Sequence, residues 1–166
     1  MYPADDIPCY SRQEFIDDLL REHETEIRRC FEKGAHKVQI DFTEGRLAVK
    51  LDDSGDLLNS FIGRNNLALS RFSVEERQRI VVHTCPGGDF DSTHSADVDY
   101  ADLMPGLFEL RVGNFYIALA GEKDRKRVLK IIRQYLKADQ RAFVGVADRS
   151  SHRYAGGSSR ASARSC

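Results

Sequence analysis

Apolar side chains recur along this chain in two spacings, one typical of helices and the other typical of strands. Ser11 and Glu14 form a capping-box pattern, and the apolar residues behind it recur every three or four positions. This pattern predicts a first helix that ends at Gly34. The same spacing predicts further helices at residues 54–72, in a short segment from Ser73, at residues 100–110 and at residues 123–136.

Short segments rich in β-branched and aromatic residues lie between these helices and predict strands. The predicted strands are residues 37–43, 79–85, 114–120 and 142–147. Because side chains alternate between the two faces of a strand, Phe115, Ile117 and Leu119 should face the helices. Strands that alternate with helices predict a parallel sheet. No Gly-x-Gly-x-x-Gly motif opens a helix, so we expect an α/β fold that is a partial (β/α)8 TIM barrel of about four β/α units.

The composition is that of a soluble globular chain. The 166 residues are 41% hydrophobic and 31% charged, enough for one domain with its own core. No apolar run approaches the roughly 20 residues of a membrane span, and no basic region of a signal peptide is visible at the N-terminus. The scattered positions of Cys9, Cys30, Cys85 and Cys166 do not resemble a disulfide framework. We therefore expect a cytoplasmic protein without a membrane partner.

Charge is distributed unevenly between the body of the chain and its end. Residues 149–166 hold four arginines and no acidic residue, which leaves 21 basic and 26 acidic residues in residues 1–148. A mildly acidic body argues against nucleic acid as the main partner. We expect residues 1–148 to form the partial barrel domain and residues 149–166 to be a disordered basic tail.

The predicted strand at residues 79–85 ends in two soft metal donors, His83 and Cys85, just before a Pro-Gly-Gly turn. Residues two apart on a strand share a face, and imidazole with thiolate suits Zn²⁺. A nucleophilic Cys85 with His83 as its base is the alternative. Their Cβ atoms would be about 6–7 Å apart, a gap that a metal bridges more easily than a hydrogen bond. We therefore prefer a metal site.

Two acidic residues fall at or just beyond the ends of other predicted strands. Active groups of (β/α)8 barrels lie at the C-terminal ends of the strands, so Asp41 and Glu122 predict a site shared with His83 and Cys85. The alternatives are that Asp41 is a strand-end turn residue and that Glu122 is an acid favoured by a helix N-terminus. His94 lies in a polar loop, where it could contact a substrate or a phosphate.

The run from His83 to Tyr100, HTCPGGDFDSTHSADVDY, resembles the cobalamin-independent methionine synthase family in its single-barrel methionine synthase II branch. Residues 38–41 (VQID), 115–122 (FYIALAGE) and 143–148 (FVGVAD) are similar to that family too, and the resemblance covers about residues 2–148. It implies a zinc-containing (β/α)8 barrel. It also implies methyl transfer from methyltetrahydrofolate polyglutamate to the thiol of homocysteine, which gives methionine.

The resemblance implies a role for each candidate residue. His83, Cys85 and Glu122 match the zinc ligands, and Asp41 matches the acid that holds the amino group of the substrate. We assign His94 and Asp97, within the run from His83 to Tyr100, as catalytic residues. Two alternatives stay open: another zinc-thiol alkyl transferase of the same barrel group, and a non-catalytic remnant.

The chain departs from the family at its end. The family's fourth zinc ligand is a Cys in a Cys-Gly-Phe motif, and the neighbours of Cys166 share nothing with it. Members of the branch are about twice as long, and the tail after Asp148 differs from theirs, for which we hypothesise a frameshift. We therefore expect an incomplete barrel with impaired activity, and its exposed sheet edges favour self-association.

Overall fold

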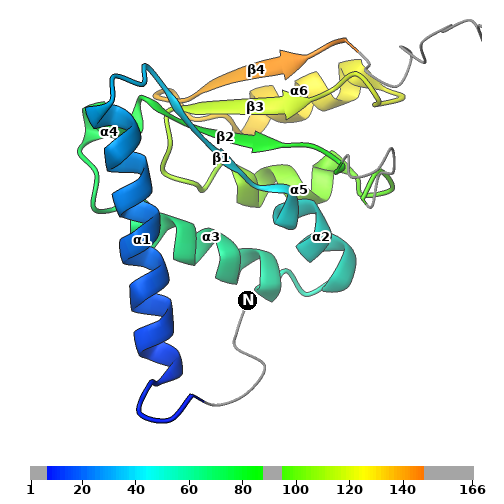
Figure 1. Cartoon of the computed structure of the whole chain (residues 1–166). Coiled ribbons are helices and arrows are strands. Elements are labelled where there is room, and N and C mark those ends of the chain that lie inside the picture. Colours follow the sequence, from blue (N-terminus) through cyan, green and yellow to red (C-terminus); the bar gives the residue numbers. More distant parts are fainter. Residues whose placement is uncertain (1–6, 88–94, 148–166) are drawn as a thin grey trace, which may run out of the picture.

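The computed structural model describes residues 7–87 and 95–147, and its centre is a parallel sheet of four strands (Figure 1). The strands lie side by side in chain order as β1 (Val38–Asp41), β2 (Ile80–Thr84), β3 (Asn114–Ala118) and β4 (Arg141–Gly145). The predicted α/β class and parallel sheet are confirmed. Consecutive strands in this order are compatible with a section of a (β/α)8 barrel.

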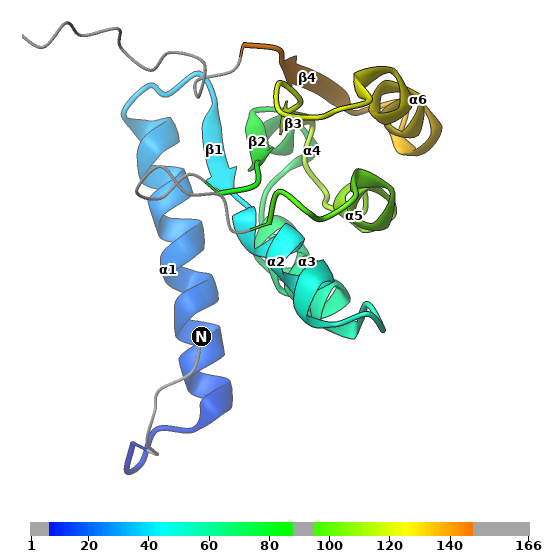
Figure 2. The same ribbon diagram turned by 90° about the vertical axis from the view of Figure 1, so that its right-hand side faces the viewer.

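One helix precedes β1, the others lie between successive strands, and together they cover one face of the sheet (Figures 1 and 2). They are α1 (Arg12–Glu32), α2 (Thr43–Leu51), α3 (Asp56–Leu69), α4 (Val74–Arg77), α5 (Tyr100–Leu107) and α6 (Arg125–Tyr135). The predicted capping box at Ser11 is confirmed, and α4 begins with a second one at Ser73. The backbone N–H of Glu14 donates to Ser11 Oγ at 3.2 Å, and that of Glu76 donates to Ser73 Oγ at 3.1 Å. Each interaction satisfies a helix N–H that has no partner within the helix.

The stretch after β1 differs from the prediction. The strand was expected to reach Thr43, but it ends at Asp41, and Phe42 turns the chain with φ −128° and ψ 48°. Helix α2, which the apolar spacing does not predict, begins at once. Phe42 is fully buried, and its ring lies so close to Gly45 that a Cβ there would be 2.5 Å from Phe42 Cε1. Burial of this ring therefore outweighs the alternating pattern that continued the strand.

The two faces of the sheet have different environments. Phe115, Ile117 and Leu119 are at most 1% exposed and belong to the apolar core beneath the helices, as predicted. The helix-facing positions of β1 and β2 join the same core. On the opposite face, one row of register partners crosses all four strands and consists of Asp41, His83, Tyr116 and Phe143. This face, which we call the open face, is therefore the one that presents the predicted site.

The remaining structural expectations concern membranes and the chain end. No helix in residues 7–87 and 95–147 is long and apolar enough to cross a bilayer. His94 and the predicted basic tail at residues 149–166 lie outside the described residues.

Two glycine-to-alanine substitutions should shift stability in opposite directions. At Gly113 a Cβ would lie 2.7 Å from the Cα of Gln78, so Gly113→Ala should lower the free energy of unfolding by about 1–3 kcal/mol. At Gly63, on α3, no heavy atom lies within 4 Å of an added Cβ. Gly63→Ala should therefore raise stability by roughly 0.5–1 kcal/mol through helix propensity. Urea unfolding followed by circular dichroism measures both, and equal effects would contradict the packing at Gly113.

Candidate functional site

Asp41 and His83 are brought together at the carboxyl end of the sheet. Asp41 is the last residue of β1 and is the register partner of His83 in β2. Partners across a parallel pair point to the same face, so both side chains lie on the open face. Cys85 follows the last residue of β2, two positions after His83. Asp41 is exposed, while His83 and Cys85 are half-buried, so a ligand can reach all three.

Glu122 lies in the turn that follows β3, where its carboxylate faces a buried arginine. Its backbone N–H donates to the carbonyl of Leu119 at 3.1 Å, in the turn that follows β3. Its carboxylate Oε1 lies 3.6 Å from Arg46 Nη1, and its side chain is 25% exposed while that of Arg46 is fully buried. The carboxylate therefore balances a buried positive charge, a structural role that the zinc-ligand prediction did not include.

Arg46 is the charged residue that sequence reasoning missed. Its Nε donates to the carbonyl of Ser95 at 3.0 Å, and its Nη2 donates to that of Val98 at 2.8 Å. The guanidinium carbon lies 4.4 Å from the centroid of the Tyr100 ring, within reach of a cation–π interaction. Among the described residues, Nη1 has no hydrogen-bond partner and contacts Glu122 in a looser ion pair. No sequence pattern indicated this burial, because the apolar spacing does not predict α2 and the partners of Arg46 lie far along the chain.

Tyr100 completes this cluster. Its hydroxyl donates to the carbonyl of Ala118, the last residue of β3, at 2.6 Å. Burial raises the pKa of Tyr100 to about 12, with Glu122 and Cys85 acting in the same direction and Arg46 opposing them. Burial of the phenol is the largest cause of this shift.

Glu44, also missed from the sequence, lies close to Asp41. It is half-buried in the first turn of α2, three residues after Asp41. Burial raises the pKa of Glu44, and the negative charge of Asp41 raises it further. A second carboxylate therefore adds to the negative potential at the end of β1. The signal was an acidic residue one helical turn after the strand-end acid.

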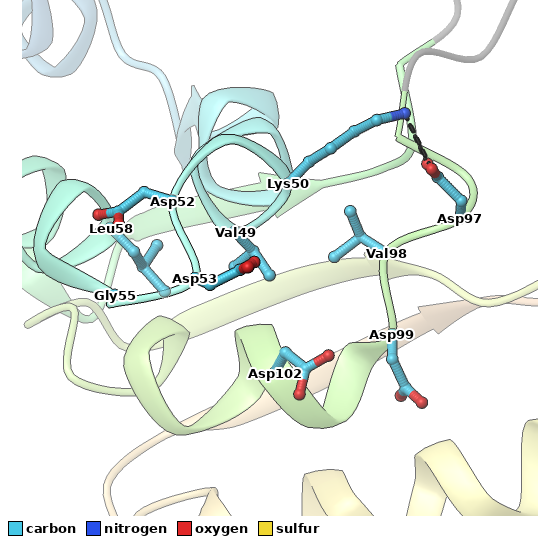
Figure 3. Close-up of a pocket in the computed structure, with 10 residues that line it drawn as sticks. All are labelled: Val49, Lys50, Asp52, Asp53, Gly55, Leu58, Asp97, Val98, Asp99 and Asp102. Carbon is cyan, nitrogen blue, oxygen red and sulfur yellow. Dashed lines mark hydrogen bonds and ion pairs between the residues drawn. The ribbon is translucent and has the colours of Figure 1, made fainter.

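Asp97 belongs to a separate acidic groove between α2 and α5 (Figure 3). Its Oδ2 lies 2.9 Å from Lys50 Nζ, and the hydrogen bond from Lys50 holds the pKa of Asp97 below its usual range. The residues lining the groove are Val49, Lys50, Asp52, Asp53, Gly55, Leu58, Asp97, Val98, Asp99 and Asp102. Neither His83 nor Cys85 lines this groove. His94, the residue predicted to be catalytic together with Asp97, lies outside the described residues.

The donor chemistry can be compared with what a metal requires. Structural and catalytic zinc sites use three or four protein donors, usually Cys, His and carboxylates. Within residues 7–87 and 95–147, no three or more His, Cys, Asp or Glu residues are grouped so that they could hold a metal ion. His83 and Cys85 supply two donors of the type that zinc prefers, and the zinc site stays a prediction.

Comparison with family models, with curated proteins and with solved structures finds no match to this chain. The family resemblance carried by residues 83–100 therefore has no support beyond the residues themselves.

The buried phenol of Tyr100 should make stability depend on alkaline pH. Its pKa is 10.0 in the unfolded reference and about 12 in the folded chain. The folded state thus holds the proton more tightly, so this contribution is fully present below pH 10 and is lost as the pH rises toward 12. The wild type should lose about 2–3 kcal/mol of unfolding free energy more than Tyr100→Phe over this interval. Urea unfolding at a series of pH values measures the difference, and parallel curves for the two proteins would contradict it.

Proposed function

We propose that this chain carries part of a zinc-thiolate methyl-transfer site, for transfer from methyltetrahydrofolate to the thiol of homocysteine. The observation that supports the proposal is the position of His83 and Cys85 at the carboxyl end of β2, with Asp41 in register beside His83. Catalytic groups of parallel α/β folds gather at this end of the sheet. The resemblance of residues 83–100 supplies the identity of the reaction.

The donor set present fits zinc in part. The imidazole of His83 and the thiolate of Cys85 would hold the ion, and Glu122 would be a third donor once it left Arg46. Bound zinc would hold the substrate sulfur as a thiolate near neutral pH. Because Arg46 keeps two hydrogen bonds to backbone carbonyls, it would stay anchored when Glu122 moved.

The other residues of the open face would position the substrate. The exposed carboxylate of Asp41 would bind the ammonium group of an amino-acid substrate, and Glu44 strengthens the negative potential there. Tyr116 and Phe143 continue the same row in an edge-to-face contact, with ring centroids 5.5 Å apart. These rings would exclude water from one side of the reacting sulfur. His94 and Asp97 stay as predicted catalytic residues.

Zinc binding should depend on His83 and Cys85 and not on the other thiols. His83→Ala and Cys85→Ser should each weaken zinc affinity at least tenfold, because each removes a ligand. Cys30→Ser is the matched control, since Cys30 is an exposed cysteine on α1. Cobalt(II) titration, read through the thiolate-to-metal absorption band, measures both affinity and thiolate coordination. An unchanged band in Cys85→Ser would refute the assignment.

The methyl-transfer step should depend on the charge of Asp41. With labelled methyltetrahydrofolate triglutamate as donor, we expect product with homocysteine and little with thiols that lack an amino group. Asp41→Asn should raise the KM for homocysteine about 10–100-fold, because it removes a charged partner of the ammonium group. Asp53→Asn, on the acidic groove, should leave the KM unchanged. Zinc binding without methyl transfer to homocysteine would favour another thiol acceptor.

A further inference from the structure

The two outer strands of the sheet each have one edge without a partner strand in the described part of the chain. β1 pairs only with β2, and β4 pairs only with β3. All four strands are parallel and follow one another in chain order. An unpaired edge is a template for pairing with another chain. At each end of the sheet, the outer strand therefore has backbone N–H and C=O groups that could pair with another parallel strand.

The helices at the two ends of the sheet carry opposite charge. α1 lies at the β1 end and holds seven acidic and four basic residues (Figure 2). α6 lies at the β4 end and holds five basic residues and no acidic one. This opposite net charge favours contact between the β1 end of one molecule and the β4 end of another.

On α1 and on α6, exposed residues at helical spacing form one stripe along each helix. On α1, Leu19, Glu22 and Glu26 recur at helical spacing and are all exposed, and we call them the acidic stripe. The corresponding basic stripe on α6 consists of the exposed residues Lys126, Leu129, Lys130 and Arg133.

The stripes are opposite in sign, with two acidic residues on α1 and three basic residues on α6. Each contains one leucine, Leu19 at 47% and Leu129 at 45% exposure, flanked by charges of a single sign. No ion pair between described residues involves a charged member of either stripe. At the β4 end, Phe143 and Val146 add exposed apolar surface, at 48% and 64%. Each end thus combines apolar area with unpaired charge, as the surface of an interface does.

We propose that two copies of this chain associate so that β4 of each lies beside β1 of the other, with the basic stripe against the acidic stripe at both junctions. Four parallel strands from each copy then make eight, the number that closes a (β/α)8 barrel. A two-fold axis along the barrel makes the two junctions identical and leaves every strand parallel to its neighbours.

Closure has a consequence for the candidate site. The open face of each copy becomes part of the barrel interior, so Asp41 and His83 face residues of the other molecule instead of solvent. The β1 strand that carries Asp41 gains the partner's β4 as its second neighbour. The site is therefore completed by the partner. This inference rests on the sheet edges and the charges, and it stands whether or not the chain transfers methyl groups.

The test uses charge reversal on the full chain. The wild type should elute as a dimer, at twice the 18.8 kDa mass of one chain, in size-exclusion chromatography with light scattering. Lys130→Glu with Arg133→Glu places like charges at both junctions and should weaken the dimer at least tenfold in Kd. Glu22→Lys with Glu26→Lys should do the same. Circular dichroism checks that each variant is folded, and Arg111→Glu, in the loop before the inner strand β3, should leave the dimer intact.

Mixing the two double variants gives the decisive result. Each junction of the mixed dimer again pairs a basic with an acidic stripe, so an equimolar mixture should recover the wild-type mass and affinity. A monomeric wild type, a mass that keeps rising with concentration, or a mixture of folded variants that stays monomeric would overturn the proposal.

Discussion

The buried guanidinium of Arg46 is the interaction on which the carboxyl end of this sheet depends. A charge with no exposed surface is tolerated only when neighbouring groups satisfy it. Here two backbone carbonyls, an aromatic ring and one carboxylate do so. These partners come from the segment after residue 95, from α5 and from the turn after β3. One side chain on α2 thus fixes three separate parts of the chain relative to one another.

That fixation reaches the candidate site through the backbone of Ser95. Its N–H donates to the carbonyl of Pro86 at 3.1 Å, and its Oγ donates to the same oxygen at 3.0 Å. Arg46 holds the carbonyl of Ser95, so the position next to Cys85 is tied to the buried cluster. Asp41 and His83, by contrast, are placed by strand register alone. The site therefore combines a rigid part, set by the sheet, with a part whose position depends on satisfying a buried charge.

The local pattern of apolar and polar residues was sufficient to predict those helices and strands that have one clearly apolar face and one clearly polar face. The strand of Asn114 to Ala118 and the capped helix behind Ser11 follow from alternation and from capping residues. Helix α2 could not be found in this way, because its buried face includes a glycine and an arginine instead of apolar side chains. The ion pair of Arg46 with Glu122 joins residues far apart in the chain, and nothing near either residue indicates it. Burial of a charge is decided by tertiary contacts, so sequence reasoning passed over Arg46.

The order of the strands also bears on how the chain reaches its fold. Each strand pairs with the next one along the sequence, so the sheet can form in chain order. During synthesis, β1 and β2 could associate with α2 and α3 before β4 has left the ribosome, since domains form from the N-terminus onward. Growth of the sheet would then proceed by addition at one advancing edge. The molecule would be built as a ribbon that lengthens strand by strand, from β1 toward β4.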